Sequence, residues 1–170
     1  MKRLHKVFIL HALFALSYIT VCVSGCVSVR LEEKNVPSSK FQYLPPDQPF
    51  TAIKNKDLSH AWQDTTTGNS ISVFSSCNEA ADLSLHQIQT DTLSVFEKYE
   101  ILEEKPVRIG PHNALSTIAV GKLDNAEIKT KLISTYQNGC SYSLSYVAPL
   151  PSYPNGLAVF EKFIQGFELP

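Results

Sequence analysis

Two kinds of hydrophobic pattern divide the chain. The first is a mostly apolar run over 7–23, which follows three basic residues and contains no acidic residue. Beyond residue 50 the apolar positions instead alternate or recur at helical spacing, which is typical of strands and amphipathic helices. The pattern therefore predicts a targeting region followed by one folded domain that contains both strands and helices.

The folded part begins with a predicted β-hairpin. Ser59–Gln63 and Ile71–Cys77 are rich in β-formers and flank the turn residues Thr65–Asn69. Trp62, the single tryptophan, is predicted to anchor the core, because a large aromatic ring contributes most when it is buried. Upstream, Phe41–Leu44 is apolar enough to lie on the domain as a strand.

Three longer strands are predicted further along the chain. They span Leu115–Leu123, Ile128–Gln137 and a segment that begins at Cys140, with a turn at Asp124–Glu127 and a strong hairpin signal at Asn138-Gly139. A preceding strand is expected over 99–105 and should be interrupted by Pro106.

The strand that begins at Cys140 alternates strictly. Aromatic and aliphatic residues occupy every second position after the cysteine, and serines occupy the positions between them. This alternation predicts one buried face and one solvated face. The two sets are Cys140, Tyr142, Leu144, Tyr146 on the buried face, and Ser141, Ser143, Ser145 on the solvated face.

Two helices are predicted. The segment 79–98 has apolar residues at helical spacing, no glycine or proline, and Asn78 as a suitable N-cap. A C-terminal helix should begin at Asn155-Gly156 and present an aromatic stripe. A core face explains this stripe better than a ligand groove, because one amphipathic helix needs it to dock on a sheet. The stripe comprises Leu157, Phe160, Phe163, Ile164 and Phe167.

The N-terminal run ends in Val23-Ser24-Gly25-Cys26, after basic Lys2, Arg3 and Lys6. This arrangement resembles the lipobox signal peptide of bacterial lipoproteins, and the resemblance implies removal of residues 1–25 and palmitate or related acyl chains on Cys26. Plain secretion and an uncleaved membrane helix are the alternatives. The implied organisation is a signal peptide (1–25), a proline-containing tether (26–40) and one domain (41–170).

The net charge predicted for the mature chain disfavours two classes of binding partner. The leader holds three of the fifteen Lys and Arg and none of the sixteen Asp and Glu, which leaves 12 basic against 16 acidic residues, a net charge of about −4. A chain without a basic excess is poorly suited to nucleic acid or to anionic lipid surfaces. Attachment to a membrane would therefore depend on the lipid at Cys26.

The two cysteines of the domain, Cys77 and Cys140, are an even pair in an exported chain. We expect a disulfide, which would close a 63-residue loop and add about 4 kcal/mol of stability in the chain-entropy model. Two buried free thiols are the alternative.

A catalytic constellation is not evident in the sequence. His60, His86 and His112 have no ligand-type spacing, so neither a metal nor a cofactor is predicted. A nucleophilic Cys77 or Cys140 near His86 competes with the disulfide. The adjacent Glu103-Glu104 pair would face opposite ways on a strand, which disfavours an acid–base dyad.

The order of elements resembles the Mog1/PsbP-like α/β sandwich over residues 41–170. The features that carry the resemblance are Ile71–Cys77 leading into a helix, the Asn113-Ala114-Leu115 start of the meander, the Tyr142–Tyr146 strand and the closing run 160–167. The resemblance implies an α+β fold, an antiparallel β-sheet flanked by an internal helix and a C-terminal helix. Members of that fold are mostly binding or assembly factors, so the resemblance favours a protein that is not an enzyme.

These observations favour a membrane-anchored, non-enzymatic accessory lipoprotein of the bacterial envelope that binds a protein partner. Val27 follows Cys26, which by resemblance to the enterobacterial sorting rule favours the periplasmic face of the outer membrane. The first alternative is a small-ligand or lipid-binding auxiliary subunit of an envelope transport system, which requires an apolar pocket between sheet and helices. The second is an envelope hydrolase, which requires a nucleophile and a base within hydrogen-bond reach.

Overall fold

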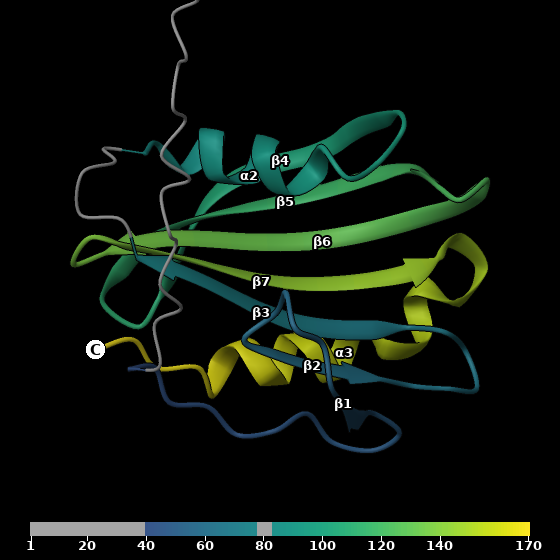
Figure 1. Cartoon of the computed structure of the whole chain (residues 1–170), viewed down its shortest axis with the longest axis horizontal. Coiled ribbons are helices and arrows are strands. Elements are labelled where there is room, and N and C mark those ends of the chain that lie inside the picture. Colours follow the sequence, from purple (N-terminus) through teal and green to yellow (C-terminus); the bar gives the residue numbers. More distant parts are fainter. Residues whose placement is uncertain (1–39, 78–82) are drawn as a thin grey trace, which may run out of the picture. The chain divides into compact units, whose positions relative to one another are not determined.

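The computed structural model describes residues 40–77 and 83–170. These residues form an antiparallel sheet of seven strands in the order β1-β2-β3-β7-β6-β5-β4, with α2 on one face and α3 on the other (Figure 1). The predicted fold class is confirmed. The elements are β1 (Thr51–Ile53), β2 (His60–Gln63), β3 (Ser70–Cys77), α2 (Leu85–Leu93), β4 (Tyr99–Ile109), β5 (His112–Leu123), β6 (Ala126–Gln137), β7 (Cys140–Pro149), a 3-10 turn (Leu150–Ser152) and α3 (Tyr153–Gln165).

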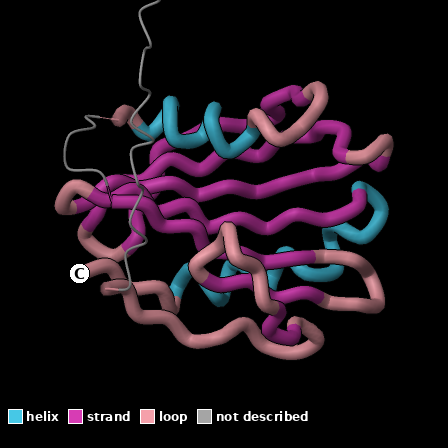
Figure 2. Tube along the Cα trace, in the orientation of Figure 1, coloured by secondary structure: helices cyan, strands magenta, loops and turns pink. Residues whose placement is uncertain are grey.

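Tight turns connect β4 to β7 into a meander (Figure 2). Asn138 and Gly139 have φ values of 52° and 75°, as a two-residue hairpin turn with the twist of the flanking strands requires. Asp124 and Asn125 adopt the same region, at 49° and 65°. The predicted hairpin at Asn138-Gly139 is confirmed, as is the hairpin of β2 and β3.

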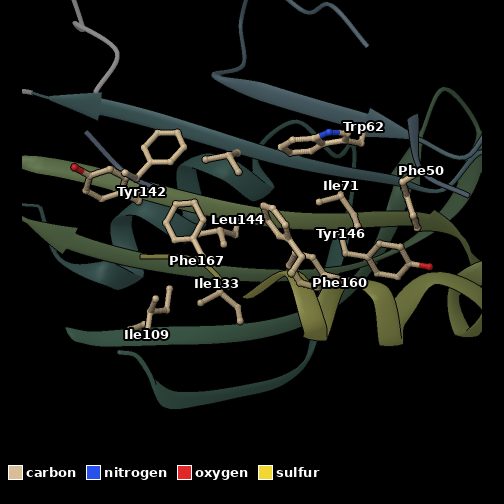
Figure 3. Packing of buried hydrophobic residues seen from close by; sticks show 14 of the residues in the cluster. Phe50, Trp62, Ile71, Ile109, Ile133, Tyr142, Leu144, Tyr146, Phe160 and Phe167 are labelled. Atoms are coloured by element: carbon tan, nitrogen blue, oxygen red, sulfur yellow. The ribbon is translucent and has the colours of Figure 1, made fainter. Parts of the chain in front are cut away.

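The main core lies between the sheet and α3 (Figure 3). Tyr142, Leu144 and Tyr146 are buried there, so the predicted inward face of β7 is confirmed, and Trp62 is 5% exposed. The aromatic stripe of α3 is a core face, since Phe160 is completely buried and stacks on Tyr146 at a ring-centroid distance of 5.8 Å.

Tyr146 also holds the first turn of α3. Its hydroxyl donates to the carbonyl of Tyr153 at 2.8 Å and accepts from the backbone N–H of Gly156 at 3.1 Å and from Asn69 Nδ2 at 3.0 Å. A Cβ on Gly156 would stand 2.8 Å from this hydroxyl, so glycine allows the helix to approach. The helix begins at Tyr153, two residues before the predicted start at Asn155-Gly156.

The internal helix is shorter than predicted. In the part of the predicted segment 79–98 that is described, which starts at residue 83, the helix covers Leu85–Leu93 and starts with a capping box between Ser84 and Gln87. The expected N-cap Asn78 lies outside the described residues. At the C-terminal end Ser94 Oγ donates to the carbonyl of Asp91 at 2.6 Å, and the chain turns so that Val95 is exposed while Phe96 is buried.

Two strand predictions are also corrected. β4 continues through Pro106 to Ile109, because β4 is the edge strand and a proline there need not donate to a second neighbour. Phe41–Leu44 makes one bridge, Gln42 to Glu168, instead of a strand, and Phe41 is nevertheless buried. Among the described residues, no helix has the length and apolarity needed to span a membrane.

Candidate functional site

A groove of about 420 Å³ lies between α2 and the part of the sheet formed by β3 and β7. Among the described residues, the nine-residue helix α2 packs mainly on β5, β6 and β7, and the groove lies where it adjoins β3. Its lining residues are Leu58, Ser72, Phe74, Ser76, Leu83, Ile88, Asp91, Thr92, Val95, Tyr136, Ser141, Ser143 and Ser145.

Five serines form the floor of this groove, and we call them the serine floor: Ser72, Ser76, Ser141, Ser143 and Ser145. The expectation that the serine face of β7 is solvated is wrong, because α2 lies over this side and leaves Ser141 7% and Ser143 3% exposed. The signal that sequence reasoning missed is that β3 repeats the pattern, with serines at 72 and 76 on the same face.

Hydrogen bonds within the serine floor satisfy much of its polarity. Ser72 Oγ and Ser145 Oγ are 2.6 Å apart, and Ser141 Oγ donates to the carbonyl of Ser76 at 3.2 Å. Ser143 Oγ lies 3.3 Å from Ser134 Oγ. Each hydroxyl has one donor and two acceptor positions, so the floor keeps acceptor capacity for a bound molecule.

The lips of the groove are apolar. Phe74 on β3 is 39% exposed and Val95, just beyond α2, is 63% exposed. Of the described residues that line the groove, Asp91 alone has an Asp, Glu, Lys, Arg or His side chain. The described lining therefore combines an apolar rim with a hydroxyl floor and offers no cation to a phosphate or carboxylate, which suits an uncharged or weakly basic occupant.

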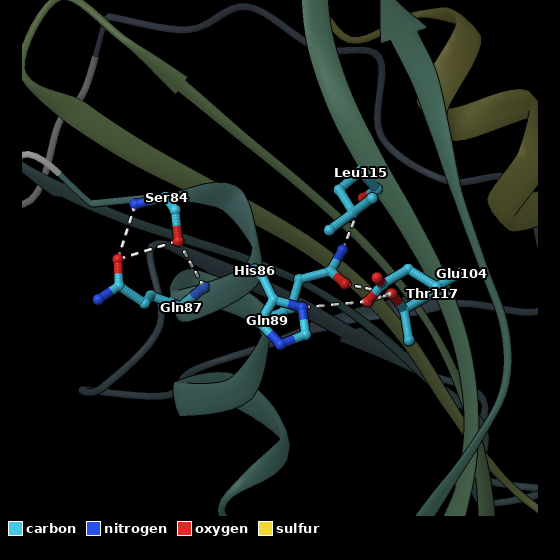
Figure 4. A network of polar contacts seen from close by, with 7 residues as sticks. All are labelled: Ser84, His86, Gln87, Gln89, Glu104, Leu115 and Thr117. Atoms are coloured by element: carbon cyan, nitrogen blue, oxygen red, sulfur yellow. Dashed lines mark hydrogen bonds and ion pairs between the residues drawn. The ribbon is translucent and has the colours of Figure 1, made fainter.

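A buried polar contact fixes α2 over the sheet (Figure 4). Gln89, 1% exposed, donates from Nε2 to the carbonyl of Leu115 at 2.6 Å and accepts from the hydroxyl of Thr117. Because a buried amide is costly unless it is hydrogen-bonded, these two bonds set the position of the helix along β5. Gln89 thus holds α2, one side of the groove, against β5.

One histidine, one acid and one hydroxyl lie close together, but their order does not suit a hydrolase. His86 Nδ1 lies 3.5 Å from Glu104 Oε2, and Thr117 Oγ1 lies 3.4 Å from the same oxygen. The acid is therefore between the histidine and the hydroxyl, whereas nucleophilic catalysis needs the base next to the nucleophile. Thr117 is also fully buried. Among the described residues, no cluster of His, Cys, Asp and Glu could hold a metal ion.

The cysteines and the remaining histidines lie elsewhere. Cys77 and Cys140 are directly opposed on β3 and β7 and form a disulfide, next to the floor residues Ser76 and Ser141. His60 Nδ1 lies 2.9 Å from the hydroxyl of Tyr43. His112 opens β5.

The remaining predictions concern the N-terminal region and the Glu103-Glu104 pair. Cys26 and the predicted signal peptide and tether lie outside the residues described, apart from Lys40, so lipidation and the domain boundaries stay predictions. Glu103 and Glu104 face opposite sides of β4, toward Lys105 and toward His86 respectively.

Comparison with known proteins defines the class of fold. No protein-family model matches the chain, and no curated protein matches its sequence. The structure is similar to CyanoP, the cyanobacterial PsbP of Synechocystis sp. PCC 6803, with a TM-score of 0.54 and 10% identity over 87% of this chain and 99% of that one. The chain therefore has a PsbP-like α+β fold.

Two further solved structures share this fold. LpqN, involved in cell envelope biogenesis of Mycobacterium tuberculosis, has a TM-score of 0.56 and 8% identity over 81% of this chain and 86% of its own. PA94 of Pseudomonas aeruginosa, a protein of unknown function and putative regulator, has a TM-score of 0.50 and 10% identity, over 83% and 87% of the two chains. At such identities the likeness concerns the fold alone.

Proposed function

We propose that the protein is a membrane-anchored, non-enzymatic binding protein of the bacterial envelope, and that it engages a protein partner through the groove between α2 and the serine floor. The observation that carries this proposal is the open groove itself, with its exposed apolar lips at Phe74 and Val95. Exposed apolar side chains around a concave surface are typical of interaction sites.

The chemistry of the groove supports binding rather than catalysis. Among the described residues that line the groove, all but Asp91 carry hydroxyl or apolar side chains, a composition that is typical of a binding surface. The sulfur atoms of Cys77 and Cys140 are bonded to each other, which removes the thiol nucleophile that a papain-like mechanism requires.

An envelope location is supported by the lipobox-like Val23-Ser24-Gly25-Cys26 and by the fold shared with LpqN, a protein of cell envelope biogenesis. Val27 after the cysteine favours the periplasmic face of the outer membrane. Palmitate labelling of the wild-type chain and of Cys26→Ser tests the anchor: label on the wild type alone is expected, and label that persists on the variant excludes Cys26 as the lipid site.

The groove is tested by site-specific photo-crosslinking in living cells. A photoreactive phenylalanine analogue at position 95 should give one discrete protein adduct, and the same analogue at Leu123, which is 38% exposed and does not line the groove, should not. Phe74→Ser combined with a photoreactive residue 95 should remove the adduct. Equal adducts at positions 95 and 123 would show non-specific contact and overturn the proposed site.

A small or lipidic ligand is the second candidate, favoured by the groove volume of about 420 Å³, which lies within the usual range of about 300–1,000 Å³ for ligand sites. Native mass spectrometry of the chain purified in mild detergent separates the two candidates. A retained mass that disappears with Ser145→Phe, which fills the floor, supports a ligand. A bare chain with an intact crosslinked partner supports the protein-binding proposal.

A further inference from the structure

The two edges of the sheet differ in how they resist pairing with another strand. β4 carries a proline at 106, a bulge between Ile101 and Glu103, and the charged residues Glu100, Glu103, Glu104 and Lys105. Prolines, bulges and charges are the usual protection of an edge strand. β1 at the opposite edge, Thr51-Ala52-Ile53, has none of these features, and all three residues are exposed.

An open slot of about 1000 Å³ runs along β1. Its lining residues come from β1 with the following Lys54-Asn55-Lys56 and from the segment that contains Tyr43, Pro45, Pro46 and Gln48. His60 and Trp62 from β2 also line the slot. Among the described residues, only β2 pairs with β1, so the other backbone edge of β1 has no partner strand.

The described residues that line the slot give it a positive charge. In the part of the chain that the structure describes, Lys54 and Lys56 are the only charged residues that line the slot, and no Asp or Glu lines it. Burial lowers the pKa of His60, so at neutral pH the positive charge comes from the two lysines. The mature chain is acidic as a whole, with 12 Lys and Arg against 16 Asp and Glu, which makes this concave surface a local exception.

We propose that the slot receives an extended acidic segment of a partner protein, which adds to the sheet as a strand beside β1. Main-chain hydrogen bonds to the open edge would supply affinity, and alternate side chains would supply specificity. Acidic groups in the segment would pair with Lys54 and Lys56. This surface is separate from the groove, because the slot and the groove share only Leu58 among their lining residues.

Trp62 provides a direct reporter, since it is the single tryptophan of the chain and lines the slot. The probe is a synthetic octapeptide of alternating glutamate and valine, titrated into the full chain in detergent micelles. We expect a saturable change in tryptophan emission and slower hydrogen exchange of the backbone amides of 51–53. No change in either signal would overturn the proposal.

Two controls separate strand addition from charge attraction. The same peptide, N-methylated at alternate residues, keeps its charge but loses backbone donors and should bind at least about tenfold more weakly. The protein variant Lys54→Glu/Lys56→Glu should weaken binding about tenfold, and the matched variant Lys122→Glu/Lys129→Glu on β5 and β6 should stay within about twofold.

Each remaining outcome also decides the proposal. Equal binding of the methylated peptide would exclude strand pairing, and equal losses in the two lysine variants would show general electrostatic attraction instead of a specific site. The variant Phe74→Ser/Val95→Ser, which alters the groove lips, should bind the peptide normally. Loss of binding in that variant would place the peptide in the groove and overturn the assignment to β1.

Discussion

Tyr142, Leu144 and Tyr146 of β7 face α3 and are almost completely buried, whereas Ser141, Ser143 and Ser145 of the same strand face α2 and line a groove. On the α3 side, aromatic rings from β2, β7 and α3, and from the segments that precede β1 and follow α3, pack into one buried cluster. On the α2 side, a smaller cluster around Leu93 and Leu132 lies beside hydroxyl groups.

The two faces of β7 therefore differ in their part in the molecule: one contributes to stability through buried rings, and the other lines the groove to which the proposed function assigns recognition. Large side chains stabilise by the area that they bury, and α3 covers them along 13 residues. The nine residues of α2 are positioned by the Gln89 contacts, and the strand face below α2 carries small hydroxyl side chains, which bury less area than the rings on the α3 side. We expect most of the free energy of unfolding to originate on the α3 side.

The largest expected effect comes from removing a phenylalanine ring from each side of the sheet. Phe160→Ala on α3 should lower the free energy of unfolding by about 3–5 kcal/mol, because a fully buried ring is lost and a cavity remains. Phe74→Ala on the groove lip is the matched control and should cost less than about 1 kcal/mol, since the ring is 39% exposed. Urea unfolding measures both, and similar losses would contradict the assigned asymmetry.

The disulfide joins β3 and β7, and both strands contribute to the α3 core on one face and to the groove on the other. Cys77→Ser/Cys140→Ser should lower the free energy of unfolding by up to about 4 kcal/mol, because the closed loop spans 63 residues. The loss should affect the α3 core and the groove alike. Thermal unfolding with and without reductant measures the effect, and the double variant should be insensitive to reductant. A wild-type melting temperature unchanged by complete reduction would contradict the expected contribution.

A smaller change should loosen the α2 side alone. Gln89→Leu leaves the Leu115 carbonyl and the Thr117 hydroxyl without their partner, which should cost about 1–3 kcal/mol. Amides of α2 should then exchange faster with deuterium while those of α3 keep their protection. Gln87→Leu, which loses only the exposed capping box, is the control and should cost less than about 1 kcal/mol. An equal increase in the exchange rates of α2 and α3 amides would mean that the two sides of the sheet unfold together.

The smallest effect concerns pH and the turn between β2 and β3. Hydrogen bonds from the Thr67 hydroxyl and the Thr66 N–H hold the pKa of Asp64 below its ordinary value. The stabilisation is therefore complete above about pH 4 and is lost as pH falls through the lowered pKa of the folded state. Asp64→Asn should flatten this acid-side dependence in urea titrations at several pH values, and Thr67→Val should reproduce part of the change. An unchanged slope in Asp64→Asn would exclude this carboxyl as its source.

Much of the fold was predictable because its signals are local. Asn138-Gly139 specifies a turn by backbone conformation alone, and the period-two pattern of β7 identifies its buried face without knowledge of any partner. The stripe at Phe160 and Phe163 likewise needs only the helical period. Ser84 and Gln87 also have the spacing of a capping box, so the sequence itself contains the signal for the start of α2.

The groove was not predictable in the same way. Whether Ser143 is solvated or covered depends on where α2 lies, and that position follows from the contact between Gln89 and Thr117, residues 28 apart in the sequence. Pro106 was misinterpreted for a similar reason, since its tolerance depends on β4 being an edge strand. Both errors concern tertiary placement, which composition and periodicity do not encode.

The pairing of β3 with β7 also bears on the order in which the chain folds. From β4 to β7 each strand pairs with its sequence neighbour across a tight turn, whereas β3 must find a strand that begins 63 residues after its own end. Closing a longer loop costs more chain entropy before any contact is gained. We expect the meander to form in the transition state and the β3–β7 pairing to follow. Chevron analysis should then give a larger φ-value for Ile133→Val in β6 than for Val73→Ala in β3, and the reverse order would reject this sequence of events.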